Sequence, residues 1–339
     1  IGSPWRILSP WRTVYDGLCV IEGGEIRWRR YPEWLGHWPA FLGFVLLVGI
    51  IENLTRVPRI PEVTAVVVAG YGLVMFLGAF VFGRKWFERA DAMEVFYELL
   101  GTVAPLRLHE TDGNRPSIVL RYPWQGCTTP VESRTVVAFV VTMVYTVTFD
   151  GFAESPVYRE IYFGVQETFG VGGTVSVLLY CLGLVGFVGG FVAIAIVVGR
   201  LLSEAQTRTE STTQHHVDSD GGAAVTTPLA LAPTVLPIAA GYEFAHNFSY
   251  VLTYAGRLPT VAGAPSVDPL WWLSLPLFWG IQVLLIVAGH VAAVITADAV
   301  VRRLAPTDQW AVVAHTPLLV LMIGYTVLSL WIISLPVAA

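Results

Sequence analysis

Long runs of apolar residues, separated by short polar loops, dominate the chain from about residue 38 to its end. A helix that crosses the hydrocarbon core of a bilayer needs about 20 such residues. Seven runs predict spans, at residues 38–54, 63–83, 135–152, 172–199, 226–255, 271–300 and 309–336. None alternates between apolar and polar positions as a strand would. The pattern therefore predicts an all-α fold, a polytopic transmembrane helix bundle of about seven spans within residues 38–339.

The composition agrees with this prediction. The chain is 55% hydrophobic and only 13% charged, whereas an average soluble domain carries about 25% charged residues. We therefore expect the lipid bilayer as a partner and a multi-pass protein of the cell membrane. The net charge of −5 is carried mainly by loops, and the sequence contains no feature that indicates binding of nucleic acid.

The distribution of arginine predicts the orientation. Arginines are concentrated before the first span, between the second and third, and between the sixth and seventh, while the intervening loops hold few. Positive loops favour the cytoplasm, so we expect a cytoplasmic N-terminus and an extracytoplasmic C-terminus. Because the chain opens with Ile1, we also expect the gene product to continue upstream.

Three polar segments interrupt or precede the bundle. Residues 84–133 are predicted to form a cytoplasmic insert, with an amphipathic helix over 85–104 on the inner leaflet. A β-hairpin should follow over 106–122, because two strand-like runs flank Asp112-Gly113-Asn114. Residues 203–222 are polar and rich in Ser and Thr, which predicts a disordered cytoplasmic loop.

The N-terminal segment, residues 1–37, contains the tetrapeptide Ser-Pro-Trp-Arg twice, at 3–6 and 9–12. Trp and Arg together suit the lipid headgroup region, where the indole lies at the interface and the guanidinium reaches phosphate. We interpret the segment as a cytoplasmic interfacial anchor, and a specific lipid or substrate site is the alternative.

Glycines within two spans predict close helix contacts. The fourth span contains Gly183, Gly186, Gly189 and Gly190, and small residues at such spacing allow neighbouring helices to approach. Gly289 precedes His290 in the sixth span and should likewise admit a second helix or a flat cofactor.

Ionisable residues inside the spans are the candidates for function, because they are costly in a bilayer. Toward the predicted outer face these are Glu52, Asp150, Glu243 and His246; deeper, or toward the inner face, they are His290, Asp298 and His315. Glu243 and His246 stand three residues apart and therefore project from one face of a helix.

Asp150, Glu243 and His246 are the predicted metal ligands. Glu-x-x-His is a spacing that carboxylate-bridged metal bundles use, although those bundles need two copies and this chain has one. Carboxylate and imidazole ligands suit Zn, Mn or Fe, and such a metal could activate water. The cofactor itself is left unknown by the sequence. Capping of helix ends at the water interface is the alternative for Glu52 and Asp150, and structural hydrogen bonding for His246.

His290 and His315 from two helices could hold a haem, but no haem-attachment motif is present. A proton relay or an interhelical hydrogen bond is the preferred interpretation. We predict that Asp150, His246 and His290 approach one another; failing that, His246 pairs with Asp150 alone and His290 with His315.

Several stretches resemble a family of prokaryotic polytopic membrane proteins commonly labelled fenitrothion hydrolase. They include residues 30–39, Phe82-Gly83-Arg84, 147–152, 245–249 and 289–291, in matching order along nearly the whole chain. The family often has His-Asp near the end of the span that holds His290, where this chain has Ala297-Asp298. The resemblance implies hydrolysis of phosphotriester-like substrates, with Asp150, His246 and His290 as the matching catalytic positions.

Three functions follow as hypotheses. The first is a membrane-embedded, metal-assisted hydrolase of a small-molecule substrate. The second is a permease for a small solute or metal ion, based on the intramembrane acids and histidines. The third is a structural subunit of a membrane complex. The arrangement of Asp150, His246 and His290 around a cavity would discriminate among the three.

Overall fold

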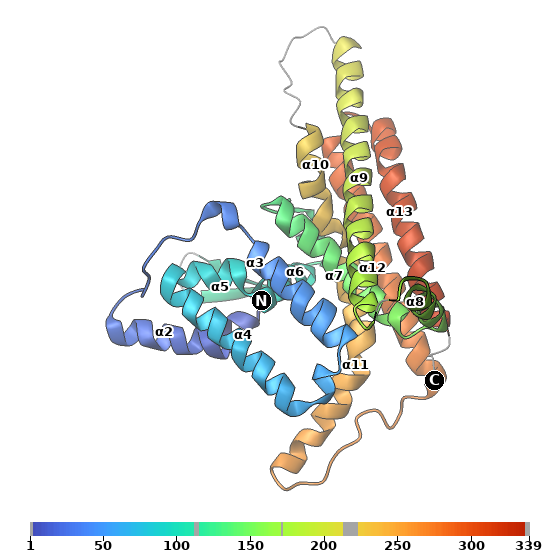
Figure 1. Ribbon diagram of the computed structural model, residues 1–339. Helices are drawn as coiled ribbons and strands as arrows, with labels where there is room; N and C mark the ends of the chain where they lie inside the picture. The colour runs from blue at the N-terminus through green and yellow to red at the C-terminus, as the bar shows by residue number, and fades with distance from the viewer. Residues whose placement is uncertain (1–2, 112–114, 171, 213–222, 336–339) are drawn as a thin grey trace.

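The computed structural model describes all residues except 1–2, 112–114, 171, 213–222 and 336–339. Helices dominate the described chain (Figure 1). In order, the elements are α1 (Trp5–Leu8), α2 (Pro10–Glu22), η1 (Glu33–Leu35), α3 (Trp38–Phe44), η2 (Val45–Glu52), η3 (Val57–Arg59), α4 (Pro61–Phe82), α5 (Arg84–Ala90), α6 (Ala92–Val103), β1 (Leu106–Thr111), β2 (Arg115–Leu120), η4 (Pro123–Thr128), α7 (Arg134–Ala153), α8 (Pro156–Phe169), α9 (Val175–Thr212), α10 (Ala223–Leu231), η5 (Ala232–Val235), α11 (Leu236–Val261), α12 (Leu275–Leu304) and α13 (Asp308–Ser334).

Among the described residues, six helical stretches are long and apolar enough to cross a membrane: Glu33–Glu52, Pro61–Phe82, Arg134–Ala153, Val175–Thr209, Leu275–Leu304 and Asp308–Ser334. The chain is therefore compatible with a multi-pass integral membrane protein, but the predicted count of seven is not confirmed. The predicted span 226–255 is divided among α10, η5 and α11, and α11 carries Glu243, His246 and Asn247 within a less apolar sequence.

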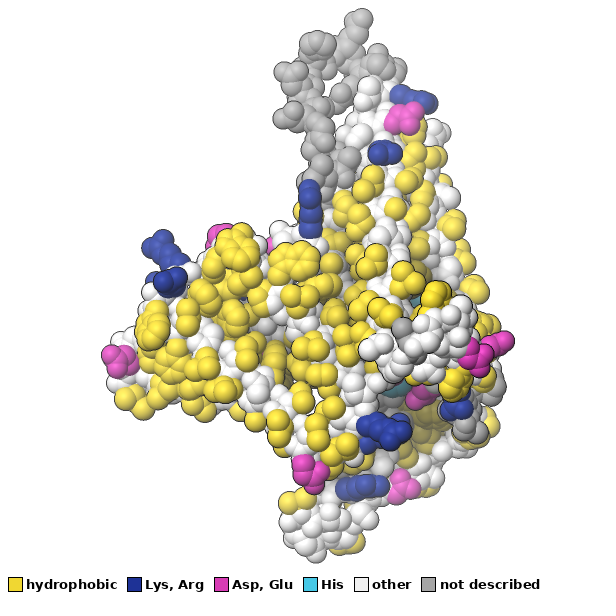
Figure 2. Space-filling view, in the orientation of Figure 1, with side chains coloured by type: hydrophobic (Ala, Val, Ile, Leu, Met, Phe, Trp, Pro, Cys, Tyr) yellow, Lys and Arg dark blue, Asp and Glu magenta, His cyan; other side chains and the backbone are white. Residues whose placement is uncertain are grey.

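Helix α7 is the centre of the bundle. Most of its residues are buried, and it packs against α3, α9, α11 and α13. Few residues of helix α4 are buried inside the protein, which fits a helix that faces lipid on one side. Figure 1 shows α9, α12 and α13 running side by side, with the N-terminal helices α2 to α6 to one side of them. Figure 2 shows hydrophobic side chains spread over much of this face, with few charged groups among them.

Glycine sets the closest helix contacts. A Cβ at Gly241 of α11 would lie 2.7 Å from the carbonyl oxygen of Leu285 on α12, and one at Gly289 would lie 2.5 Å from that of Pro237 on α11. The predicted close approach at Gly289 is thus confirmed. In α9 a Cβ at Gly183 would collide with the Tyr145 hydroxyl, whereas Gly186, Gly189 and Gly190 have nothing within 4 Å. Those three glycines make no such contact.

The predicted helix over 85–104 is wrong in one respect. It consists of two helices, α5 and α6, that meet at Asp91, whose side chain accepts hydrogen bonds from the backbone N–H of Met93 and Glu94 and so caps α6. The chain turns there because an N-cap residue has extended backbone geometry. Asp91 and Glu94 are buried, so they do not lie on an exposed polar face.

Strands β1 and β2 pair antiparallel, with Leu106 opposite Leu120 and Thr111 opposite Arg115. The predicted turn, 112–114, lies outside the described residues, and the cytoplasmic position of this insert stays a prediction. Helix α9 extends to Thr212, so the segment predicted as a disordered loop begins as helix; 213–222 lie outside the described residues. Helix α8, with Ser155 as its N-cap, was not predicted.

Candidate functional site

Asp150 and His246 lie in direct contact. Asp150 is near the C-terminal end of α7, and His246 is in the middle of α11. The distance between Asp150 Oδ2 and His246 Nε2 is 3.1 Å, and the side chains are 26% and 47% exposed. The neighbouring Gly151 packs closely: a Cβ there would lie 3.1 Å from Ile332 Cγ2 of α13 and 3.2 Å from the Tyr242 hydroxyl of α11. The sequence prediction that Asp150 and His246 meet is confirmed; no observation tests their role.

The contact determines which ring nitrogen of His246 is available to accept a proton. When Nε2–H donates to the Asp150 carboxylate, Nδ1 carries the lone pair that can accept a proton. The carboxylate also stabilises the imidazolium that forms after proton transfer. An oriented His–Asp pair of this kind can act as a general base or as a proton carrier.

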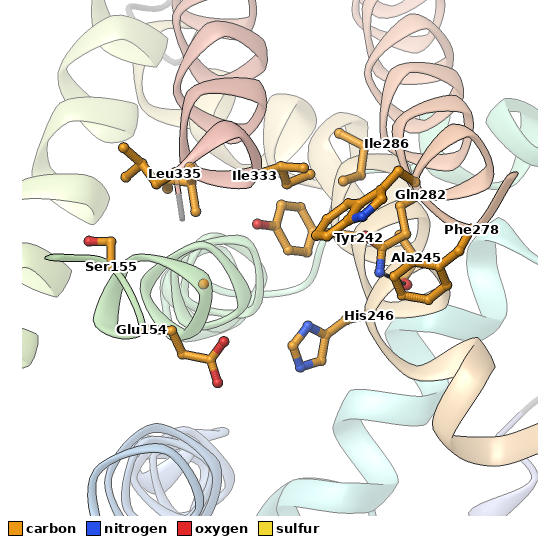
Figure 3. Close-up of a pocket in the computed structure, with 13 residues that line it drawn as sticks. Glu154, Ser155, Tyr242, Ala245, His246, Phe278, Gln282, Ile286, Ile333 and Leu335 are labelled. Atoms are coloured by element: carbon orange, nitrogen blue, oxygen red, sulfur yellow. Dashed lines mark hydrogen bonds between the residues drawn. The ribbon is translucent and has the colours of Figure 1, made fainter. Parts of the chain in front are cut away.

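A cavity of about 280 Å³ opens beside the pair. Its polar lining includes His246, Glu154 and Gln282, and its apolar lining includes Phe278, Trp279 and Ile333. In Figure 3 the Glu154 carboxylate and the His246 ring face each other across the cavity, and the two interact electrostatically. Gln282 donates to the backbone oxygen of Ala245 at 3.1 Å and so ties α12 to α11. This volume admits only a small molecule.

Ser155 also lines this cavity but is not a candidate nucleophile. Its Oγ accepts the backbone N–H of Tyr158 at 3.2 Å as the cap of α8, and its side chain is buried. The base–nucleophile contact of a serine hydrolase needs a hydroxyl within hydrogen-bond reach of the histidine. Water is therefore the nucleophile that this site can offer.

Two further acids contribute charge to the site. Glu243 interacts electrostatically with His246, Glu52 and Asp150, and Glu52 interacts with Asp150 and His246. The Glu243 carboxylate is itself held by Asn247, whose Nδ2 donates to Oε1 at 3.1 Å. The pair thus lies near two further acids, Glu52 on η2 and Glu243 on α11.

The predicted metal ligands do not form a ligand group as they are placed. In the part of the chain that the structure describes, no three His, Cys, Asp or Glu side chains are grouped so that they could hold a metal ion. Asp150 meets His246, but Glu243 bonds to Asn247 instead. The metal assignment therefore stays a prediction, and the chemistry below depends on the protein's own groups.

His290 does not line the cavity at His246, so the predicted approach of Asp150, His246 and His290 to one another is not seen. Its Nδ1 lies 2.8 Å from the carbonyl oxygen of Ile286, within its own helix. His315 Nδ1 lies 3.6 Å from Asp298 Oδ1. Among the described residues the Nε2 atoms of both histidines lack a hydrogen-bond partner. The predicted pairing of His290 with His315 is not seen, and Asp298 is the group that faces His315.

A second polar centre was missed by the sequence reasoning. Asp91 Oδ2 accepts the indole N–H of Trp5 at 3.0 Å and of Trp11 at 2.9 Å. Arg6 and Arg12 contact Glu94 Oε1 at 2.6 and 3.3 Å. Each copy of the Ser-Pro-Trp-Arg repeat therefore supplies one tryptophan to Asp91 and one arginine to Glu94.

Two signals could have revealed this centre. The tryptophans of the repeat are six positions apart, as are the arginines, and Asp91-x-x-Glu94 is a helix-start spacing. The repeat was interpreted as a headgroup anchor because Trp and Arg are common at interfaces. In the structure both indole N–H groups bond to Asp91 and both arginines contact Glu94, and the interfacial position of residues 1–37 stays a prediction.

Comparisons of the chain with family descriptions, curated proteins and solved structures find no match. The resemblance given by residues 147–152 and 245–249 therefore stays a prediction. These two stretches contain Asp150 and His246, the two residues that are in contact beside the cavity.

Proposed function

We propose that this protein is a membrane-embedded hydrolase of small, neutral, apolar esters, with phosphotriesters as the substrate class implied by the resemblance. The contact between Asp150 and His246 at the wall of the cavity carries the proposal. The apolar wall of Phe278, Trp279 and Ile333 suits an uncharged substrate.

In this mechanism His246 Nδ1 takes a proton from water as the water oxygen attacks phosphorus. Asp150 holds the imidazole in the required tautomer and stabilises the imidazolium. The bond from phosphorus to the leaving oxygen breaks, and the leaving group departs with that electron pair. The proton on His246 then passes to solvent or to the leaving oxygen. The products are a diester anion and an alcohol or phenol.

The surrounding acids give the site its selectivity. Glu52, Glu154 and Glu243 all interact electrostatically with His246. Their negative charge disfavours an anionic substrate and favours release of the diester anion after reaction. Hydrolysis should therefore stop after the first ester bond.

The test is release of 4-nitrophenolate by the purified protein in detergent. We expect turnover of diethyl 4-nitrophenyl phosphate and none of the monoanionic ethyl 4-nitrophenyl phosphate. His246→Gln and Asp150→Asn should each lower kcat about 10²- to 10⁴-fold, while His315→Gln, which alters a histidine outside the cavity, should leave it unchanged. Absence of wild-type turnover, or an unchanged rate in His246→Gln, would refute the proposal.

A proton-coupled permease is the second candidate. The observation in its favour is that Asp150 and His246 share their electrostatic environment with Glu52 and Glu243 from other segments. Proton relays in transporters use such clusters of acids and histidine. Solute-driven acidification of liposomes that contain the protein, abolished by His246→Gln without any hydrolysis, would favour this function over the first.

A further inference from the structure

A second cavity, of about 350 Å³, lies between the N-terminal helices and η2. The residues that line it include Trp5, Trp11, Tyr71, Met93, Val67 and Glu52. It shares no lining residue with the cavity at His246. Nearly all of its wall is aromatic or aliphatic, and Glu52 is the charged residue among those that line it.

The polar atoms of its aromatic wall are already used. Trp5, Trp11 and Tyr71 all donate to the carboxylate of Asp91, at 3.0, 2.9 and 2.8 Å. Asp91 therefore fixes the three rings in place, and a ligand in the cavity meets aromatic carbon. The hydroxyl of Thr64 is likewise used, since it donates to the backbone oxygen of Val57 at 2.7 Å.

Glu52 is different from the other polar groups of this wall. Within the described residues its carboxylate has no hydrogen-bond or ion-pair partner, and its interactions with Asp150 and His246 are at longer range. It ends η2, whose residues have the wide turns of a π-helix, a conformation that is rare and frequent at functional sites. Gly49 in that segment packs against Tyr180, where a Cβ would collide with the hydroxyl.

We propose that this cavity binds a hydrophobic cation, an aromatic or aliphatic molecule with one ammonium group. Glu52 is exposed and ends a candidate membrane span, and a carboxylate without a partner at that position is stabilised by an opposite charge. The faces of Trp5, Trp11 and Tyr71 attract the same charge through cation–π interaction. An anion would be repelled by Glu52, and a purely apolar molecule would leave the carboxylate uncompensated.

Benzyltrimethylammonium and its uncharged isostere neopentylbenzene are the probes for this test, because the two have the same shape. Binding to the whole protein in detergent is measured by isothermal titration and by quenching of tryptophan fluorescence. We expect the cation to bind about tenfold or more tighter than the isostere. Glu52→Gln should abolish that preference and retain binding of the isostere, while Glu62→Gln, an acid on α4 outside the cavity wall, should change neither.

A second variant keeps the test decisive if Glu52→Gln is unstable. Val67→Phe fills the cavity and should weaken both probes without altering their ratio. Equal affinity of the two probes in the wild type, or a preference that survives in Glu52→Gln, would overturn the proposal; equal affinity would indicate an apolar or lipid-filled space. Neither result depends on ester hydrolysis, so the proposed function can fail while this inference stands.

Discussion

Two carboxylate centres in this protein are built in opposite ways. At the first, Asp91 accepts five hydrogen bonds, from Trp5, Trp11, Tyr71 and the backbone of Met93 and Glu94. It is 1% exposed. At the second, Asp150 contacts His246 beside an open cavity. A saturated carboxylate has no capacity left for a ligand, whereas an accessible pair that retains a proton-accepting atom can do chemistry. The comparison separates a structural centre from a candidate catalytic one.

The largest effect is expected at the structural centre. Asp91→Ala leaves two indole N–H groups and a tyrosine hydroxyl without their acceptor inside the protein. Breaking a buried charged network costs on the order of 3 to 5 kcal/mol, which thermal unfolding in detergent would detect.

Asp16→Ala is the matched control for Asp91→Ala. Asp16 contacts Arg84 at 2.8 Å, but both side chains are substantially exposed. Exposed ion pairs contribute about 0 to 1 kcal/mol. Equal unfolding temperatures for the two variants would show that Asp91 is not the structural centre.

The converse variant tests the other half of the comparison. Asp150→Asn should lower ester turnover about 10²-fold or more, because the imidazole loses its orienting carboxylate. Its unfolding temperature should change little, since Asp150 is a partly exposed group. A large loss of stability with unchanged turnover would reverse the roles assigned to the two centres.

Sequence reasoning identified the acids and histidines of the spans but not all of their partners. Asp150, His246 and His290 are predicted to meet because each is costly in an apolar helix, and of the three Asp150 and His246 are in contact. The position of His290 could not be predicted, because its Nδ1 is satisfied by the carbonyl of Ile286 on its own helix. Local bonds of this kind leave no signal in the pattern of spans.

The Asp91 centre shows a different limit. Both copies of the repeat are more than 75 positions from Asp91 and Glu94 in the sequence, so composition indicates an interfacial segment and cannot indicate a long-range partner. Likewise, the polar residues of α11 made the difference between seven predicted spans and six observed candidates. The run 226–255 contains Glu243, His246 and Asn247 and is divided among α10, η5 and α11, so it does not form one long apolar helix.

The contact between α11 and α12 provides a smaller perturbation of the catalytic centre alone. Gly241→Ala places a Cβ 2.7 Å from the Leu285 backbone oxygen and 3.2 Å from Gly289 Cα. The helices must separate, at a cost of about 1 to 3 kcal/mol, and His246 should move with α11. Ester turnover should therefore fall, while the unfolding temperature should decrease only modestly.

Gly280→Ala in α12 is the control, because a Cβ there meets nothing within 4 Å. In a helix that substitution should stabilise by up to about 1 kcal/mol. If both glycine variants keep full turnover, the α11–α12 contact does not position the catalytic pair.

The smallest expected effect concerns Glu94 and its dependence on pH. Burial raises the pKa of the Glu94 carboxyl above its ordinary value, and Arg6 and Arg12 oppose the shift. An acid whose pKa is raised on folding binds its proton more tightly in the folded state. Its contribution to stability is therefore complete below the ordinary glutamate pKa and is lost as the pH rises through the folded value. The wild type should lose stability as the pH rises through this window just above the ordinary value, and Glu94→Gln should remove that pH-dependent loss.

The comparison with Glu98→Gln is informative, because Glu98 is a half-exposed neighbour that Arg6 contacts at 3.4 Å. Unfolding temperatures measured across the window should separate the two variants. If the pH dependence is the same in both, the two arginines keep Glu94 ionised across this window, and Glu94 belongs to an ion-pair network that does not titrate there.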